Sequence, residues 1–189
     1  KNNFNVCFFG TFVKQKAVDL ETCLKGFDLL DSEQQKRFKL IMCGDGPMLN
    51  YAKRVSSSAS VVFTGRIDSA KIWTLMQRCQ LGLLPYNPES HFLLSVPNKA
   101  AEYIAGGIPI ITSLTKGSLH EMLVYYDGGT FYNGGNPLSF KEALLSMNRD
   151  PAQLEKMKGN MAGLYAEMFD SAMVLASVSD WLEQLVDGY

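Results

Sequence analysis

The stretch "SVPNKAAEYIAGGIPIITS", residues 95–113, places a short helix immediately before a strand of apolar residues. At about 100° per residue, one face of that helix collects small and apolar side chains: Ala100, Ala101, Ile104 and Ala105. Alanines let a helix press against a sheet, so we expect this face to be buried. The opposite stripe holds Asn98, Glu102 and Gly106, with Lys99 and Tyr103 beside it. The strand is apolar on both faces, which indicates a sheet covered by helices on both sides.

The same alternation of helical spacing and short apolar runs continues along the chain. Two segments repeat apolar residues at i, i+3, i+4 and i+7: Leu20, Cys23, Leu24 and Phe27, then Ile72, Leu75, Met76 and Cys79. We expect Asp68 and Ser69 to cap the helix of the second segment. Six apolar runs predict strands at residues 5–10, 38–44, 61–65, 81–86, 108–113 and 129–133. Strands that alternate with helices indicate βαβ units. We therefore predict an α/β fold with a doubly wound, mainly parallel six-stranded sheet of the Rossmann-like kind.

The last part of the chain has a helical pattern. Pro137 and Pro151 are each placed to open a helix, and the pattern continues to about Val186. We expect residues 137–189 to form a helical tail on a single domain of residues 1–189, because no repeat or linker divides the chain. The chain begins at Lys1 and enters a strand within a few residues, so we expect a domain taken from a longer protein.

Composition bounds the classes of partner. A net charge of −1 and a pI near 6.2 offer no basic surface for nucleic acid or anionic lipid. No apolar run approaches the roughly 18 residues of a membrane span. The four cysteines lack C-x-x-C spacing, so we expect reduced, buried thiols in a cytoplasmic protein: Cys7, Cys23, Cys43 and Cys79. The chain has no Asp-x-Asp sequence and no histidine cluster, so we expect no metal site and no cofactor.

Ligands of open α/β sheets lie beyond the carboxyl ends of the strands, where the strand order reverses. The segments that follow the predicted strands are "GTFVKQK" (10–16), "GDGP" (44–47), "GRIDS" (65–69), "PYNPESHFLLSVPNK" (85–99) and "TKGS" (115–118). Three of them begin with glycine, which lets backbone approach a ligand closely. In the first segment, Lys14 and Lys16 are placed either to meet a phosphate beside free N–H groups or to lie in solvent.

The segment "GDGP" has two interpretations. It is either a loop that lines a ligand through Gly44 and Asp45, or a tight turn with Pro47 at the first helical position. A dinucleotide fingerprint, G-x-G-x-x-G, would need glycine where Leu49 stands and would follow the first strand. The segment therefore does not favour a dehydrogenase.

Glu102 lies one turn into the helix that Pro97 starts. The N–H groups at that helix start would bind an anion, and a carboxylate beside the anion would repel it. Glu102 is therefore expected to face neutral donors such as the hydroxyls of a ribose or another sugar. The alternative is an exposed ion pair with Lys99 at i, i+3, which contributes roughly 0.2–0.5 kcal/mol. The residues alone leave both interpretations open.

Residues 95–113 also resemble a family signature. They are similar to the donor-binding segment of the GT-B glycosyltransferases known as glycosyl transferases group 1, in which a Pro-Asn-Lys or Pro-Ser-Lys turn runs into E-Y-x-A-x-G-x-P-I-I. The segments "KLIMCGDGP", "VVFTGRI" and "KGSLHEML" resemble further blocks of that family in the same order. The resemblance spans nearly the whole chain and implies the C-terminal, nucleotide-sugar-binding half of a two-domain enzyme.

The resemblance carries roles onto particular positions. Glu102 matches the glutamate that holds the ribose hydroxyls, and Lys16 matches the lysine of the phosphate-binding loop, so we expect both to be catalytic. The turn whose amides meet the diphosphate and sugar corresponds to Ser95, Val96, Pro97, Asn98 and Lys99. The segment that lines the base corresponds to Gly65, Arg66 and Ile67. The expected donor-binding set is completed by Gly10, Thr11, Lys14, Gly44 and Asp45.

Two positions depart from the family pattern. Family members commonly have an arginine directly after the first-strand glycine, where this chain has Thr11. Many also have a glutamate eight residues before the Glu102 equivalent, where this chain has Leu94. Two residues of the same loop, Glu89 and His91, are candidates for contacting the sugar. Glu121 matches a family glutamate that starts a helix, where we expect a helix-terminus charge.

The resemblance implies a retaining transfer of a sugar from a UDP-, GDP- or ADP-sugar to a saccharide or lipid-linked acceptor, in polysaccharide biosynthesis. The acceptor site would belong to an N-terminal domain absent from this chain, so we expect this fragment to bind donor without turnover. We expect a cytoplasmic protein, at most peripheral at the inner face of the plasma membrane through that domain. The alternatives are a sugar-nucleotide epimerase of the same architecture and a non-catalytic binding module, which Thr11 and Leu94 motivate.

Overall fold

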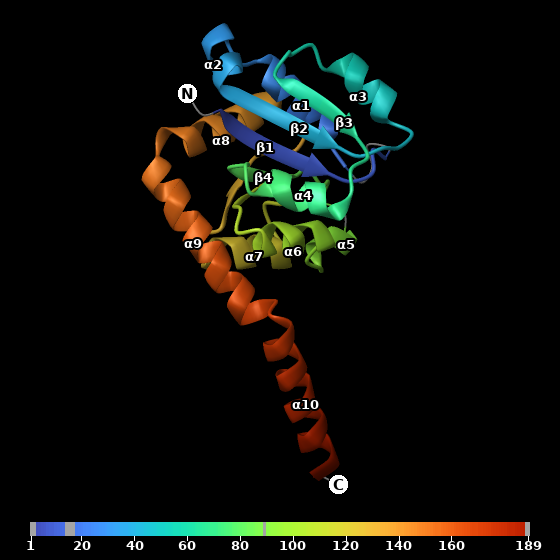
Figure 1. Ribbon diagram of the computed structural model, residues 1–189, viewed down its shortest axis with the longest axis vertical. Coiled ribbons are helices and arrows are strands. Elements are labelled where there is room, and N and C mark those ends of the chain that lie inside the picture. Colours follow the sequence, from blue (N-terminus) through green and yellow to red (C-terminus); the bar gives the residue numbers. More distant parts are fainter. Residues whose placement is uncertain (1–2, 14–17, 89, 188–189) are drawn as a thin grey trace.

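Six strands form one sheet in the order β3-β2-β1-β4-β5-β6, and every strand pair is parallel (Figure 1). The structure is a computed structural model that describes residues 3–13, 18–88 and 90–187. The strands are β1 (Phe4–Phe9), β2 (Phe38–Cys43), β3 (Val61–Gly65), β4 (Leu81–Leu84), β5 (Ile110–Thr112) and β6 (Gly129–Phe131). The strand order reverses between β1 and β4. The predicted doubly wound sheet is confirmed, with strand ends shifted by one or two residues.

Burial along the strands follows from their place in the sheet. The central strands β1, β4 and β5 are almost wholly buried, which accounts for their continuous apolar sequences. The edge strand β3 alternates instead, with Val62 and Thr64 exposed. The core therefore lies on both faces of the middle of the sheet.

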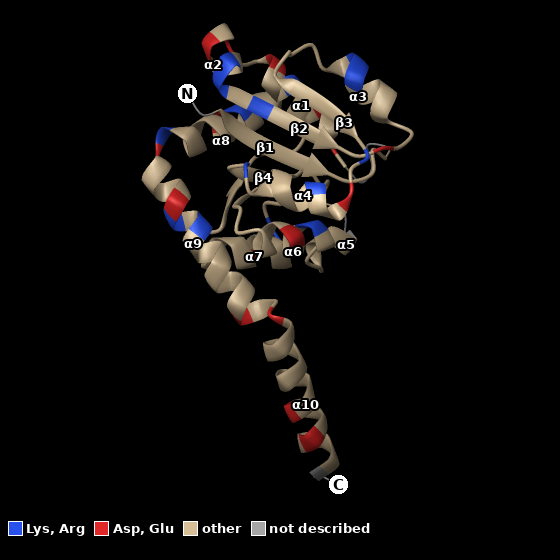
Figure 2. Cartoon of the chain, in the orientation of Figure 1, with Lys and Arg blue, Asp and Glu red and all other residues tan. Residues whose placement is uncertain are grey.

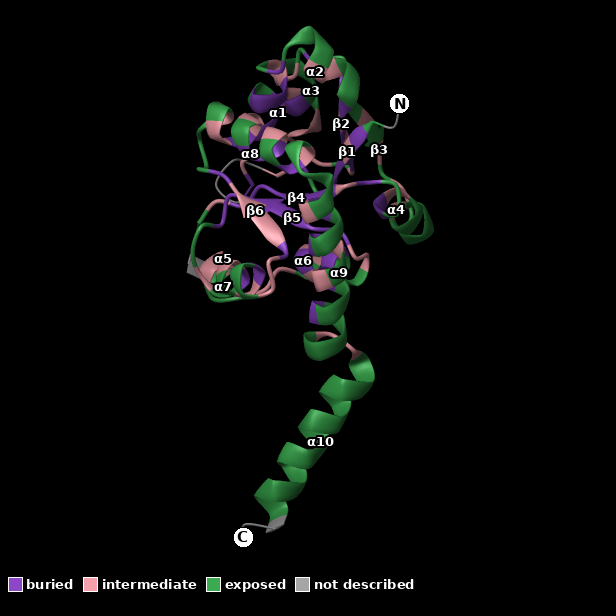
Figure 3. Ribbon diagram, turned by 90° about the vertical axis from the view of Figure 1, so that its left-hand side faces the viewer, coloured by how far each residue is buried: buried purple, intermediate pink, exposed green. Residues whose placement is uncertain are grey.

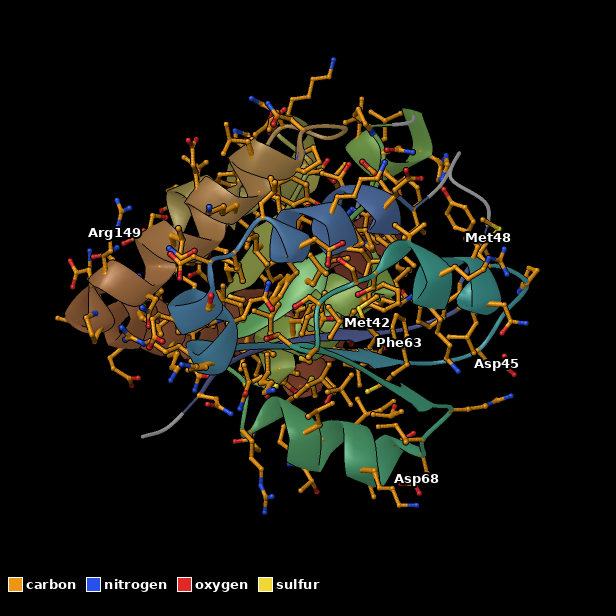
Figure 4. The ribbon with its side chains drawn as sticks, turned by 90° about the horizontal axis from the view of Figure 1, so that it is seen from above. Met42, Asp45, Met48, Phe63, Asp68 and Arg149 are labelled. Carbon is orange, nitrogen blue, oxygen red and sulfur yellow. The ribbon has the colours of Figure 1, made fainter. Side chains whose placement is uncertain are left out.

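Ten helices are described in these residue ranges, and the sheet has helices on both of its faces. They are α1 (Leu20–Asp28), α2 (Ser32–Arg37), α3 (Leu49–Val55), α4 (Ser69–Met76), α5 (Ser90–Leu93), α6 (Asn98–Ala105), α7 (Ser118–Tyr125), α8 (Pro137–Arg149), α9 (Pro151–Met168) and α10 (Ser171–Asp187). Helices α1, α3 and α8 pack together on one face, and α4 covers the other (Figure 4). Helix α6 lies against β4 and α9.

The buried face of α6 differs from the prediction. It consists of Ala100, Tyr103 and Ile104, whereas Ala105 is exposed and Ala101 is half-buried. The Tyr103 ring takes the space that a side chain at Gly82 would need. Its hydroxyl group lies 3.1 Å from the Cys7 carbonyl oxygen and 3.2 Å from that of Leu83. The helix is rotated toward Tyr103 because the ring fills the core while its hydroxyl keeps hydrogen-bond partners.

Two helix starts test the capping predictions. Asp68 caps α4 as expected, because its side chain accepts a hydrogen bond from the Lys71 N–H group. Of the two interpretations of "GDGP", the one that places Pro47 at the first helical position is wrong, since α3 begins at Leu49 and Pro47 lies in the preceding turn. The Met48 N–H group donates to the Phe12 carbonyl oxygen at 2.9 Å, which holds this turn against the loop after β1.

The helical tail has the predicted starts. Pro137 opens α8 and Pro151 opens α9, whose buried residues Leu154, Met157, Met161 and Leu164 pack on the core. The chain then bends near Phe169, and α10 extends away from the rest of the molecule with its described side chains exposed (Figure 3). Among the described residues, no helix is both long and apolar enough to cross a bilayer.

Candidate functional site

A cleft of about 720 Å³ opens at the carboxyl ends of β1, β2 and β3 and at the N-terminal ends of α4 and α6. Asp45 after β2 and Asp68 before α4 lie at this end of the sheet, whereas Arg149 lies at the opposite end (Figure 4). The cleft therefore occupies the place where the strand order reverses, as expected for a doubly wound sheet. Its lining residues are Phe9, Gly10, Thr11, Cys43, Gly44, Asp45, Gly46, Arg66, Ile67, Ser69, Ile72, Asn98, Lys99 and Glu102.

The floor of the cleft is backbone. The N–H group of Gly10 donates to the Cys43 carbonyl oxygen at 2.9 Å, and that of Gly44 donates to the Gly65 carbonyl oxygen at 2.8 Å. These bonds hold the loops after three neighbouring strands together. A Cβ atom at Gly44 would lie 1.8 Å from the Gly10 carbonyl oxygen, so only glycine allows this approach. The cleft is thus floored by peptide groups that a ligand can approach closely.

Lys99 forms the wall above Gly10. Its Cε atom lies 2.3 Å from where a Cβ atom of residue 10 would stand, and its Nζ atom lies 2.8 Å away. The Lys99 ammonium group donates to the Tyr86 hydroxyl oxygen at 3.3 Å. It lies near the first turn of α6, where Pro97 is the N-cap residue and supplies no side-chain cap. The positive end of the α6 dipole and the Lys99 ammonium group therefore both face the backbone floor of the cleft.

Glu102 lies one turn further along α6, with its exposed side chain on the cleft. Both Glu102 and Lys99 belong to the described part of the chain, where the ion pairs involve other residues. The expected alternative, an exposed pair between these two side chains, is therefore absent. The carboxylate is left facing the cleft, where it can accept hydrogen bonds from hydroxyl groups.

Helix α4 forms the opposite wall and has a different electrostatic character. Asp68 accepts hydrogen bonds from the Lys71 N–H group at 2.9 Å and pairs with the Lys71 ammonium group at 2.7 Å. Hydrogen bonding to Lys71 lowers the pKa of the Asp68 carboxyl group. The N-terminus of α4 is thus already neutralised by its own cap, whereas that of α6 has no such cap. An anion in the cleft is favoured on the α6 side.

The structure brings nine of the residues predicted for the site into the cleft: Gly10, Thr11, Gly44, Asp45, Arg66, Ile67, Asn98, Lys99 and Glu102. Gly65 does not line the cleft, but its carbonyl oxygen accepts the hydrogen bond of the Gly44 N–H group. Ser95, Val96 and Pro97 lead into α6 without lining the cleft, and the Ser95 hydroxyl donates to the His91 carbonyl oxygen at 2.6 Å. Lys14, Lys16 and Glu89 lie outside the described residues.

Five lining residues were not in the predicted set: Phe9, Cys43, Gly46, Ser69 and Ile72. Gly46 and Ser69 do lie within the segments that were expected beyond the strand ends, 44–47 and 65–69. Phe9 and Cys43 end their strands, one position before the glycines that were identified. Ser69 and Ile72 lie on α4, and the packing of α4 on the sheet decides which of its side chains face the cleft. Inclusion of the last strand residue and of the first helical turn would have found four of them.

The cysteines are free and buried, as predicted. A hydrogen bond with Cys79, together with burial, raises the pKa of the Cys7 thiol, and burial raises the pKa of the Cys23 and Cys43 thiols. These three thiols are therefore protonated near neutral pH and are not poised as nucleophiles. Within residues 3–13, 18–88 and 90–187, no group of three or more His, Cys, Asp or Glu side chains is arranged to hold a metal ion.

Comparison with known families places this cleft in context. The model of the family described as Glycosyl transferases group 1 matches residues 3–150. The chain belongs to this family. The matched residues include β1 to β6 and both walls of the cleft, so the group 1 glycosyltransferase assignment rests on the part of the chain that builds the site. No curated protein sequence shows significant similarity to the chain.

Solved structures share the fold of this group 1 domain. HepE from Anabaena in complex with UDP superposes with a TM-score of 0.78 at 18% identity, over 97% of this chain and 49% of its own. Sucrose-phosphate synthase from Thermosynechococcus elongatus gives 0.73 at 16% identity, over 100% and 47%. The C-terminal domain of LpcC from Francisella tularensis gives 0.67 at 17% identity, over 89% and 87%. The fold is the Rossmann-like half of GT-B glycosyltransferases, and this chain spans about half the length of HepE and of sucrose-phosphate synthase.

Proposed function

We propose that the chain is the nucleotide-sugar-binding domain of a retaining glycosyltransferase that transfers a sugar to a saccharide or lipid-linked acceptor. One observation carries the proposal: Lys99 and Glu102 project from one helix into a cleft that is floored by the backbone of Gly10 and Gly44. A nucleotide sugar presents an anionic diphosphate next to a ribose with two hydroxyl groups. The site offers a cation for the diphosphate and, next to it, a carboxylate for the ribose hydroxyl groups.

The spacing along α6 suits this ligand. Asn98 and Lys99 occupy the first turn and Glu102 the second, a rise of about 6 Å from residue 98 to residue 102. The diphosphate would lie at the uncapped N-terminus, over Gly10, and the ribose hydroxyls would donate to Glu102. Arg66 and Ile67, after β3, would then line the base.

The chemistry assigned to this half of the enzyme is electrostatic. Transfer breaks the bond between the anomeric carbon and the diphosphate oxygen, and negative charge develops on the leaving diphosphate. Lys99 and the positive end of α6 would stabilise that charge, and Lys16 is proposed to add a second cation. We propose Lys16 as a catalytic residue in this sense, and Glu102 as a catalytic residue that holds the donor through its ribose hydroxyl groups, without a cofactor.

The rest of the enzyme is proposed from the comparisons. HepE has been crystallised with UDP-glucose as well as with UDP, and this chain spans about half of the HepE length. We propose that a preceding N-terminal domain supplies the acceptor site and that closure of the two domains assembles the reaction centre. The reaction would take place in the cytoplasm or at the inner face of the plasma membrane, in polysaccharide biosynthesis.

A binding module without catalysis is the second candidate. Thr11 lines the cleft where the family commonly places an arginine, and Leu94 is 82% exposed where many members have a glutamate. These two side chains supply neither a cation nor an acid. Sugar transfer by the longer protein would exclude this candidate, and donor binding without transfer would favour it.

The first test is calorimetric titration of the chain with UDP, GDP and ADP. We expect one nucleotide to bind selectively, and Glu102→Ala to weaken its binding by about 1 to 3 kcal/mol, because a charged hydrogen-bond acceptor is lost. Glu121→Ala is the matched control, since Glu121 is an exposed glutamate in the first turn of α7, outside the cleft. Absence of binding by all three nucleotides, or equal losses in the two variants, would contradict the proposal.

A further inference from the structure

Tyr86 follows β4 and is held firmly at the edge of the cleft. Tyr86 is only 6% exposed, and its backbone forms an isolated antiparallel bridge with Val18. The Ser113 hydroxyl donates to the Tyr86 carbonyl oxygen at 2.7 Å, and the Asp19 N–H group donates to the Pro85 carbonyl oxygen at 2.7 Å. Segments from two other parts of the chain, around Val18 and around Ser113, thus fix the backbone at this position.

The Tyr86 ring is fixed as well. It stacks on Phe92 of α5 with ring centroids 4.4 Å apart and an interplanar angle of 8°. The Phe92 ring is in turn covered by His91, at a centroid distance of 4.0 Å. A tyrosine has few rotatable bonds, and a stacked ring restricts them further. The Tyr86 hydroxyl therefore occupies one place in the structure.

That hydroxyl group is a fixed acceptor for a flexible cation. The Lys99 Nζ atom lies 3.3 Å from the hydroxyl oxygen and 6.0 Å from the ring centroid. A lysine side chain loses much of its conformational entropy when it is ordered. Because Tyr86 orders Lys99 before a ligand binds, binding of the ligand to Lys99 is not opposed by this loss of entropy.

We propose that Tyr86 is a positioning residue that holds the Lys99 ammonium group over the Gly10 backbone, ready for the phosphate groups of a nucleoside diphosphate. This inference rests on the proposed function and extends it to a residue that does not itself line the cleft. Tyr86 acts through Lys99 alone, by pre-ordering it.

A hydroxyl group suits this role better than a carboxylate. It accepts one hydrogen bond from the ammonium group and leaves two N–H donors for phosphate oxygens. It carries no charge, so the positive charge of Lys99 stays uncompensated and available. A carboxylate at the same place would order Lys99 equally well but would repel the diphosphate.

A double-mutant cycle tests the proposal. The variants are Tyr86→Phe, Lys99→Met and their combination, titrated with UDP, or with GDP or ADP if the chain selects one of those. We expect Tyr86→Phe to weaken binding about three- to tenfold when Lys99 is present, and less than twofold in the Lys99→Met background. Equal losses in both backgrounds, or no loss in either, would overturn the proposal.

The control variant is Tyr132→Phe. Tyr132 is also buried, at 2% exposure, and its hydroxyl group lies 3.2 Å from the Cys23 sulfur atom, away from the cleft. We expect this variant to bind the nucleotide as the unsubstituted chain does, even if it is less stable. A loss equal to that of Tyr86→Phe would show that any buried tyrosine hydroxyl has this effect, and would overturn the specific role.

A second measurement separates this proposal from the proposed function. The Lys99 Nζ signal in an NMR spectrum of the free chain reports on its hydrogen bond directly. We expect that signal to shift in Tyr86→Phe and to stay unchanged in Tyr132→Phe. If no nucleoside diphosphate binds the unsubstituted chain, the proposed function fails. An unshifted Lys99 signal instead shows that Tyr86 does not hold Lys99, and the positioning role fails.

Discussion

At the scale of single residues, a methyl group added at Gly10 would meet the end of the Lys99 side chain, whereas one added at Gly44 would meet peptide backbone. The nearest atom at Gly10 is Lys99 Cε, at 2.3 Å, and the nearest at Gly44 is the Gly10 carbonyl oxygen, at 1.8 Å. Both residues also have a positive φ that disfavours other amino acids, 154° and 142°. A lysine side chain can move aside, but two hydrogen-bonded loops cannot do so cheaply.

We therefore predict different consequences for Gly10→Ala and Gly44→Ala. Gly10→Ala should lower the free energy of unfolding by about 1–3 kcal/mol and abolish most nucleotide binding, because Lys99 is displaced. Gly44→Ala should cost more than about 3 kcal/mol, because the loops after β1 and β2 must separate. Urea unfolding and calorimetry measure the two effects. Equal destabilisation by the two substitutions would show that strain in φ, common to both positions, outweighs the contacts.

At the scale of helices and strands, α7 and α9 are joined by a hydrogen bond that depends on pH. The Tyr126 hydroxyl, just after α7, bonds to Glu167 on α9, and this bond, with some burial, raises the pKa of Tyr126 from 10.0 to about 12. Because the pKa is higher in the folded state, folding favours the protonated phenol. Its contribution is complete below pH 10 and is lost as the pH rises toward 12.

We predict that the unsubstituted chain loses more unfolding free energy between pH 9 and pH 11 than Tyr126→Phe does. Phenylalanine keeps the ring and removes both the hydroxyl group and its titration. Urea unfolding of the two proteins at pH 9, 10 and 11 gives the comparison, because all other titratable groups are common to both. Parallel curves for the two proteins would show that the bond to Glu167 does not stabilise the fold.

The helices and strands also show how much of the fold could be predicted from the sequence. The strands were found because each is a short apolar run, and α4, α8 and α9 because Asp68, Pro137 and Pro151 mark their starts. The rotation of α6 was missed because it depends on Gly82, on another strand, which leaves room for Tyr103. A helical wheel contains no information about a neighbouring strand.

The candidate site divides in the same way. Gly10, Gly44 and Asp45 directly follow strands, and they were predicted because the carboxyl ends of parallel strands share one edge of the sheet. Glu102 was predicted from the family resemblance, because the residues of α6 alone left two interpretations open. Ile72 was missed because only packing shows which face of α4 borders the cleft. Tyr86 was missed because its importance lies in a contact with Lys99, thirteen residues away.

At the scale of the whole molecule, α10 stands apart from the folded body. Its apolar residues Val174, Val178, Trp181, Leu182 and Leu185 share one face and are all exposed, with Trp181 at 59%. The helix has acidic side chains and no Lys or Arg, in contrast to the mixed charges elsewhere (Figure 2). The described part of α10 therefore presents an apolar face to solvent.

We predict that deletion of residues 171–189 changes the free energy of unfolding by less than about 0.5 kcal/mol, because the described part of α10 buries little surface. Deletion from residue 151 is the contrasting variant, since it also removes the buried residues of α9 and should unfold the domain. Urea unfolding followed by circular dichroism checks both. A large loss on removal of α10 alone would show that it packs on this domain in solution.

The place of β1 in the sheet has a consequence for synthesis in the cell. It pairs with β2 along one edge and with β4 along the other. The second partner is made later, because β2 ends at Cys43 and β4 ends at Leu84. A ribosome adding roughly 5–20 residues per second needs about 2–8 seconds to cover that interval. During that time β1, β2 and β3 can already associate, while one edge of β1 remains unpaired and apolar on both faces. Among the described strands, we therefore expect β1 to be the one most exposed to mispairing during synthesis.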